Sequence, residues 1–223
     1  MNVVLFGATG MIGQGVLREC LLDSGVERVV TVGRSRTGVT NPKLRDIVYN
    51  DLPNFAPIEA LLEGFDACFF CLGVTSAGMS EGDYSRITYD LTMAAASVLV
   101  RLNPEMTFVF VSGAGTDSTE RGRLMWARIK GKTENALLRM PFKAAYMLRP
   151  GVVQPMHGVR SRTAAYRILY SMTAPLIPML RRLLPNQILT TEEMGRAMLN
   201  AVRRGAPTRV LESRDIHRLA ASG

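Results

Sequence analysis

The first 22 residues combine an apolar strand, three regularly spaced glycines and an amphipathic helix, and no other stretch constrains the fold as strongly. Val3–Phe6 is apolar throughout, which predicts a short buried strand, and glycines follow at Gly7, Gly10 and Gly13. The first glycine allows a tight turn, the second lets backbone approach a pyrophosphate, and the third lets the helix pack on the strand. Because the helix N-terminus also offers free N–H groups, the stretch predicts a phosphate cradle.

Strands and helices alternate along most of the remaining chain. Apolar runs predict strands at 27–34, 45–50, 65–72, 106–111 and 143–148, with helices at 55–63, 81–102 and 123–140 among them. This alternation indicates the α/β class, with a doubly wound parallel sheet, a Rossmann fold, that carries helices on both faces. We expect one domain over 1–223, with a cofactor core at 1–150 and a small, mainly helical elaboration at 151–223. Ligands should lie at the carboxyl ends of the strands.

The C-terminal third carries most of the formal net charge of +8. Its segment 157–184 has five arginines, no acid and many apolar residues, and Pro175 and Pro178 interrupt it. These arginines and prolines argue against a transmembrane span. A substrate lid or a homodimer face is one interpretation, weak contact with an anionic membrane is another, and nucleic-acid binding is the least favoured. Thr190 and Glu193 then form a predicted capping box, and a last edge strand is expected at 208–211.

Three cysteines are too few for a disulfide framework. Cys68 and Cys71 have C-x-x-C spacing, but they lie in a predicted strand, where residues i and i+3 point to opposite faces. We therefore interpret them as buried apolar residues and predict no metal site. The first strand starts at Asn2, which leaves no room for a signal peptide before it, and a cytoplasmic location is expected.

The residues after the second predicted strand bear on the type of nucleotide. An acid there would hydrogen-bond the ribose 2′-OH of NAD, but the chain has Arg34, Ser35 and Arg36. Two arginines and a hydroxyl suit a 2′-phosphate, which favours NADP over NAD. The alternative is a pair of exposed loop arginines. Leu72 and Gly73 end the fourth strand, where the chain should turn beneath the cofactor.

The spacing G-x-x-G-x-x-G resembles that of the short-chain dehydrogenase/reductase superfamily, in its extended and atypical branches. More narrowly, the chain resembles atypical members of the Tat-interacting-protein (CC3) type, within the NAD-dependent epimerase/dehydratase group. The matching stretches are 7–13, 32–34, 70–73, 130–134, 148–152, 196–200 and 211–217. The resemblance implies an NADP-binding oxidoreductase, and the family also has regulatory and partner-binding roles.

The resemblance also implies that an acid after the third strand, here Asp51, meets the adenine amino group. The candidate cofactor-binding residues are Gly7, Thr9, Gly10, Met11, Ile12, Gly13, Arg34, Arg36, Asp51, Leu52, Leu72, Gly73, Lys130, Pro150 and Gly151.

The family's catalytic roles carry over to three positions. Ser112 would bind the substrate oxygen and Lys130 would hold the nicotinamide ribose, but Trp126 stands where the family has its proton-donating tyrosine. An indole N–H can orient an oxygen, yet it does not ionise usefully. Tyr84 and Tyr89 could approach from the long helix. Two hypotheses stay open: an oxidoreductase with an unknown small substrate, and an inactive NADP(H)-binding sensor with a protein or membrane partner.

Overall fold

A seven-stranded parallel sheet forms the centre of the molecule in the computed structural model, which describes residues 1–52, 54–159 and 187–222. The strand order is β3-β2-β1-β4-β5-β6-β9, and it reverses between β1 and β4. The strands are β1 (Asn2–Phe6), β2 (Arg28–Gly33), β3 (Leu44–Val48), β4 (Ala67–Phe70), β5 (Thr107–Val111), β6 (Ala144–Arg149) and β9 (Val210–Glu212). This arrangement confirms the predicted doubly wound Rossmann fold.

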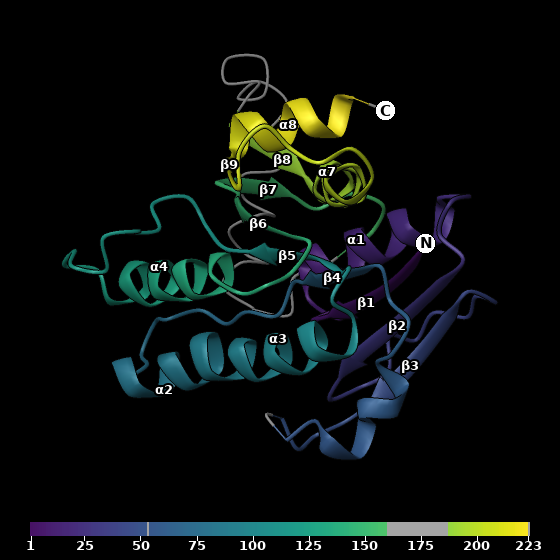
Figure 1. Cartoon of the computed structure of the whole chain (residues 1–223). Helices are drawn as coiled ribbons and strands as arrows, with labels where there is room; N and C mark the ends of the chain where they lie inside the picture. Colours follow the sequence, from purple (N-terminus) through teal and green to yellow (C-terminus); the bar gives the residue numbers. More distant parts are fainter. Residues whose placement is uncertain (53, 160–186, 223) are drawn as a thin grey trace.

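Helices cover both faces of the sheet (Figure 1). One layer contains α1 (Met11–Leu22), α7 (Thr191–Arg204) and α8 (Ser213–Ala221). The opposite layer contains α2 (Glu81–Ser85), a π-helical turn η2 (Arg86–Asp90), α3 (Leu91–Leu102) and α4 (Met125–Leu138), with the 3₁₀ helix η1 (Ala56–Leu61) nearby.

Alternating side chains of the buried strands fill two separate cores. Leu5 and Phe69 face the layer of α1, α7 and α8, whereas Phe6 and Phe70 face the layer of α3 and α4. The Phe6 and Phe70 rings stack with their centroids 5.1 Å apart. Both sheet faces are apolar because parallel strands are covered on both sides, and the sheet is thereby held rigid beneath its carboxyl edge.

The prediction that Cys68 and Cys71 face opposite sides of the sheet is confirmed, with Cys68 buried and Cys71, just after β4, partly buried. Cys68 lies in the core beneath α3, and Cys71 packs against the opposite core beneath α1. All three cysteines are free. Burial raises the pKa of the Cys68 thiol well above its usual value, so this thiol stays protonated and unreactive.

Two predicted helices differ in detail from the structure. The helix expected at 55–63 is the shorter 3₁₀ helix η1, which has Pro57 in its first turn. The long helix at 81–102 contains the π-helical turn η2. The Thr92 hydroxyl donates to the Thr88 carbonyl oxygen at 2.7 Å next to that turn.

The C-terminal third adds a second, two-stranded parallel sheet that the sequence did not predict. Its strands are β7 (Val152–Gln154) and β8 (Ile188–Thr190). The capping box of α7 is confirmed: the Glu193 N–H donates to Thr190 Oγ1 at 3.0 Å, and Glu193 Oε2 accepts from the Thr190 N–H at 2.6 Å. The predicted edge strand is β9, which pairs parallel to β6.

Residues 160–186 lie outside the described part of the chain, and with them almost all of the basic segment 157–184. The lid, homodimer, membrane and nucleic-acid interpretations of that segment therefore stay predictions. Among the helices that the structure describes, none has the length and apolar character needed to cross a membrane.

Candidate functional site

The glycine turn between β1 and α1 is so tightly packed that no larger residue fits at two of its positions. Gly7 has a φ of +75°, and a Cβ on it would lie 2.6 Å from the backbone of Cys71 and Leu72 after β4. A Cβ on Gly13 would lie 2.1 Å from the Gly7 carbonyl oxygen. The turn thus brings the carboxyl ends of β1 and β4 together at the point where the strand order reverses, which is where this fold binds its ligand.

The N-terminus of α1 provides an uncapped set of backbone donors above this turn. Gly10 is the N-cap, no side chain caps the helix there, and the first turn holds no acid. The Gly10 N–H donates to the Gly7 carbonyl oxygen at 2.9 Å, and Thr9, Met11 and Ile12 are only partly buried. The free N–H groups and the positive end of the helix dipole at this N-terminus are suited to binding a pyrophosphate. These residues fit the phosphates of a dinucleotide.

Replacing Gly13 with alanine tests the close approach of α1 to the turn. The new Cβ would overlap the Gly7 carbonyl group, so we expect a loss of roughly 1–3 kcal/mol in the free energy of unfolding, together with weaker NADPH binding. Urea unfolding and a fluorescence titration with NADPH measure the two effects. Gly82→Ala is the control, since its Cβ would meet nothing closer than 4.0 Å; equal stability losses in both variants would contradict the expectation.

Arg34 and Arg36 extend from the loop after β2 and are exposed. Asp46 on β3 ties this loop to the sheet, because its carboxylate accepts from Thr31 Oγ1 at 2.5 Å and from the Thr37 N–H at 3.0 Å. The two arginines therefore project from an anchored loop at the carboxyl end of β2, next to β1. Their role toward a 2′-phosphate stays a prediction.

The other candidate residues occupy neighbouring strand ends. Asp51 is exposed and accepts from Asn54 Nδ2 at 3.1 Å, while Leu52 packs against the core. Leu72 also packs against that core, and Gly73 faces open space, with nothing within 4 Å of a Cβ placed on it. The fold gathers these residues along one edge of the sheet, and contact of Asp51 with adenine stays a prediction.

Ser112 and Lys130, expected from the family resemblance to act together, are in contact. Lys130 on α4 donates from Nζ to the Ser112 backbone oxygen at 3.0 Å, at the end of β5. Trp126 lies one helical turn before Lys130 and therefore on the same side of α4. Its ring packs at Gly115, where an added Cβ would lie 3.5 Å from the ring edge. The structure brings Ser112 and Lys130 together, with Trp126 above the loop that follows Ser112.

Thr116 is a site residue that the sequence reasoning missed. Its Oγ1 lies 3.0 Å from Ser112 Oγ and 2.8 Å from the Gly113 carbonyl oxygen, and both hydroxyls are buried. A carbonyl oxygen can only accept, so the Thr116 proton goes to Gly113 and the Ser112 proton goes to Thr116. In this arrangement the Ser112 hydroxyl donates to Thr116, so it would have to turn away from Thr116 to donate to a substrate oxygen. The available signal was a hydroxyl residue four positions after Ser112.

The sequence also did not predict an ion pair between Glu134 and Arg149 next to the site. Glu134 on α4 is completely buried and accepts from Arg149 on β6, with Nη2 to Oε2 at 2.5 Å and Nε to Oε1 at 3.0 Å. Arg149 further contacts Ser118 at 2.6 Å and Glu212 at 3.3 Å. Glu134 raises the pKa of Arg149. The pair thus joins α4, β6, β9 and the loop after β5.

Pro150 and Gly151 complete the same connection from the end of β6. The Ala114 N–H donates to the Pro150 carbonyl oxygen at 2.9 Å, and the Gly151 N–H donates to Ser213 Oγ at 2.9 Å. The loop carrying Thr116 is therefore held from two sides, by α4 and by the residues after β6.

The N-terminal half of the chain matches the model of the NAD dependent epimerase/dehydratase family over residues 3–120. The chain belongs to this family. The family's nucleotide is a nicotinamide dinucleotide, and the glycine turn and β4 end described above lie within the matched residues. Membership confirms the resemblance to the NAD-dependent epimerase/dehydratase group that the sequence indicated.

A curated relative in Scheffersomyces stipitis, protein FMP52-1, mitochondrial, is 27% identical over 69% of this chain and 67% of its own length. The match thus spans about two thirds of that relative. The cytoplasmic location expected from the sequence is contradicted by this comparison, because the relative is named as mitochondrial. A signal peptide directs secretion, so an argument about one does not separate the cytosol from an organelle.

Solved structures share the fold at low sequence identity. An oxidoreductase of the short-chain dehydrogenase/reductase family from Burkholderia thailandensis is 18% identical, with a TM-score of 0.66 over 100% of this chain and 93% of its own. UDP-glucuronic acid 4-epimerase from Bacillus cereus, solved with NAD, is 14% identical, with a TM-score of 0.67 over 95% of this chain and 78% of its own.

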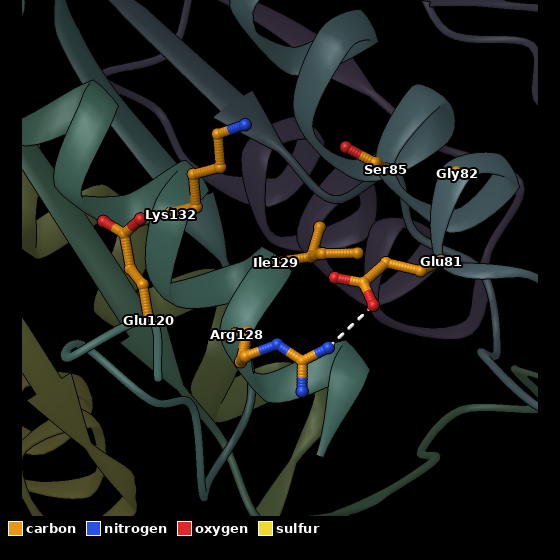
Figure 2. A pocket seen from close by; sticks show the side chains of 7 residues that line it. All are labelled: Glu81, Gly82, Ser85, Glu120, Arg128, Ile129 and Lys132. Carbon is orange, nitrogen blue, oxygen red and sulfur yellow. Dashed lines mark hydrogen bonds and ion pairs between the residues drawn. The ribbon is translucent and has the colours of Figure 1, made fainter. Parts of the chain in front are cut away.

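An open groove of about 190 Å³ lies between α2 and α4 (Figure 2), and no residue of the glycine turn lines it. Figure 2 shows Arg128 directed toward Glu81, and the two form an ion pair at 2.7 Å. Lys132 Nζ lies 4.2 Å from the centre of the Tyr89 ring, which gives this tyrosine a packing role on α4. The groove carries charges of both signs: its lining residues are Glu81, Gly82, Ser85, Glu120, Arg128, Ile129 and Lys132.

Proposed function

We propose that this family member is an NADP(H)-dependent oxidoreductase that interconverts a small carbonyl compound and its alcohol. The observation that carries the proposal is the contact between Lys130 and Ser112 at the end of β5, two strands from the glycine turn. A partly buried cation and a hydroxyl beside a nicotinamide site suit a reaction in which charge develops on a substrate oxygen. Titration with NADPH, followed by a screen of carbonyl compounds, tests it.

Each candidate residue has a distinct part in this proposal. The turn at Gly7, Gly10 and Gly13 and the first N–H groups of α1 would hold the pyrophosphate. The bound nicotinamide would exchange a hydride with the substrate carbon. Ser112 would meet the substrate oxygen, and Lys130 would lie against the nicotinamide ribose. The Trp126 N–H can orient the same oxygen as a donor.

The preference for NADP over NAD is part of the proposal and rests on Arg34 and Arg36. They are exposed on an anchored loop, with no carboxylate at the end of β2 to bind a ribose 2′-OH. A phosphate bound to a guanidinium gains charge-assisted hydrogen bonds that NAD cannot make.

Replacing Arg34 with alanine should weaken NADPH binding by about 10- to 100-fold, which corresponds to the loss of roughly 1.5–3 kcal/mol of charge-assisted hydrogen bonding. NADH affinity should stay unchanged, because NADH lacks the 2′-phosphate. Isothermal titration calorimetry with each nucleotide measures both. Arg139→Ala, an exposed arginine just after α4, is the control; equal affinity of the wild-type protein for NADH and NADPH would remove the argument for NADP.

A second candidate function is an NADP(H)-binding sensor without turnover. Trp126 favours it, because an indole cannot replace the acid and base chemistry of a tyrosine at that position. The two candidates share the nucleotide site and differ in whether a proton reaches the substrate oxygen.

A further inference from the structure

We propose that Lys130 itself gives a proton to the substrate oxygen and takes it back in the reverse direction, the part that a tyrosine would play at position 126. This inference rests on the proposed function and names the missing acid. It starts from the position of Lys130, one helical turn after Trp126 and in contact with Ser112 at the carboxyl end of β5.

The surroundings of the Lys130 ammonium group are nearly free of compensating charge. It donates to the neutral Ser112 carbonyl oxygen at 3.0 Å and lies 5.9 Å from the centre of the Phe110 ring. Across the described ranges, it forms no ion pair with a carboxylate within 4.0 Å. Glu134 lies one turn further along α4, but Arg149 occupies both of its carboxylate oxygens.

This environment makes the ammonium group a better proton donor than an ordinary lysine. Burial lowers the pKa of Lys130 to about 8, although the nearby charge of Glu134 acts in the opposite direction. A group with a pKa close to the working pH is suited to general acid–base catalysis. The neighbouring groups are poorly suited to this catalysis. Trp126 does not ionise usefully, and the Ser112 hydroxyl donates its proton to Thr116.

The proton step balances without a further reactant. In the reducing direction the substrate carbon receives a hydride, and the carbonyl π-electron pair moves onto oxygen. An O–H bond then forms as an Nζ–H bond of Lys130 breaks. The amine left behind is neutral and regains a proton from solvent before the next turnover.

Selective labelling can measure the proton affinity of Lys130 without any substrate. The chain contains four lysines, Lys43, Lys130, Lys132 and Lys143, so protein labelled with ¹³C at lysine Cε gives four assignable signals. We expect the Lys130 signal to titrate near pH 8, below the usual range of a lysine side chain. If the Lys130 signal titrates in the usual range of a lysine side chain, the proposal is overturned.

Turnover with a defined probe tests the proton step itself. With NADPH and 9,10-phenanthrenequinone, kcat/KM should be constant below pH 8 and fall about tenfold per pH unit above it, because reduction requires the charged ammonium. Lys130→Arg keeps the charge and the hydrogen bond but cannot release a proton at these pH values. This variant should have a kcat about 100-fold or more below that of the wild-type protein, and its kcat/KM should no longer fall above pH 8. Its NADPH affinity should stay within about tenfold of the wild-type value. Lys132→Arg should retain the wild-type profile.

These experiments distinguish failure of the role of Lys130 from failure of the proposed oxidoreductase function. If the wild-type protein binds no NADPH, or binds it and reduces no quinone, the proposed function fails and this inference fails with it. If the wild-type protein reduces the quinone and Lys130→Arg, folded by circular dichroism, keeps the same pH profile, only the role of Lys130 is overturned. If kcat/KM of Lys130→Arg no longer falls above pH 8, the role of Lys130 as proton donor is supported.

Discussion

Replacing Glu134 with alanine is expected to lower the free energy of unfolding by about 3–5 kcal/mol, the usual cost of leaving a buried charge without its partner. Glu134 is fully buried and Arg149 is 11% exposed, so solvent cannot compensate the arginine after the carboxylate is lost. The variant would also release α4 from β6. Urea unfolding followed by far-UV circular dichroism measures the change.

Two further variants show whether the pairing accounts for that loss. Glu81→Ala removes an ion pair whose carboxylate is 58% exposed, and it should cost no more than about 1 kcal/mol. Glu134→Leu combined with Arg149→Met should recover part of the stability lost in Glu134→Ala, because apolar residues of similar size can replace a buried pair. A loss below about 1 kcal/mol in Glu134→Ala would contradict a structural role for the pair.

Replacing Trp126 with tyrosine should raise kcat for reduction of 9,10-phenanthrenequinone by NADPH about 100-fold, within the range that a positioned general acid contributes. The new hydroxyl would lie one helical turn before Lys130, whose charge would lower the tyrosine pKa and favour proton transfer. Steady-state kinetics of NADPH consumption at 340 nm measures the gain. Trp126→Phe is the matched control, since it keeps an aromatic ring but offers no proton.

The result for the wild-type protein decides between the two candidate functions. Slow but measurable reduction, increased in Trp126→Tyr and not in Trp126→Phe, agrees with an enzyme that uses Lys130 as its acid. Activity that appears in the tyrosine variant alone would exclude a native oxidoreductase and favour the NADP(H)-binding sensor. No gain in Trp126→Tyr would mean that position 126 does not face the reacting oxygen.

Local sequence patterns predicted most of the fold. The apolar run before Gly7 predicted β1, and the spacing of Gly7, Gly10 and Gly13 predicted the turn and the start of α1. Thr190 and Glu193 predicted the capping box of α7. Such features depend on residues within one or two turns of each other, so the chain specifies them without distant partners. The same patterns overestimated η1 as a regular helix and could not place β7 beside β8.

The arrangement of the site depended on contacts between residues far apart in the chain. The family resemblance predicted that Ser112 and Lys130 act together. No local pattern predicted the hydrogen bond between Ser112 and Thr116 or the ion pair between Arg149 and Glu134. These contacts exist because the parallel sheet places β5, β6 and α4 side by side. The burial they create also lowers the pKa of Lys130.

The amino-acid sequence by itself therefore determined the nucleotide cradle, since a glycine turn between a strand and a helix is a local structure. It also predicted, through the family resemblance, that Trp126 occupies the position of the family's tyrosine. The proposal that Lys130 supplies the proton rests on the tertiary structure. Proton affinity depends on burial and on which neighbouring charges are already paired, and both are properties of the packed molecule.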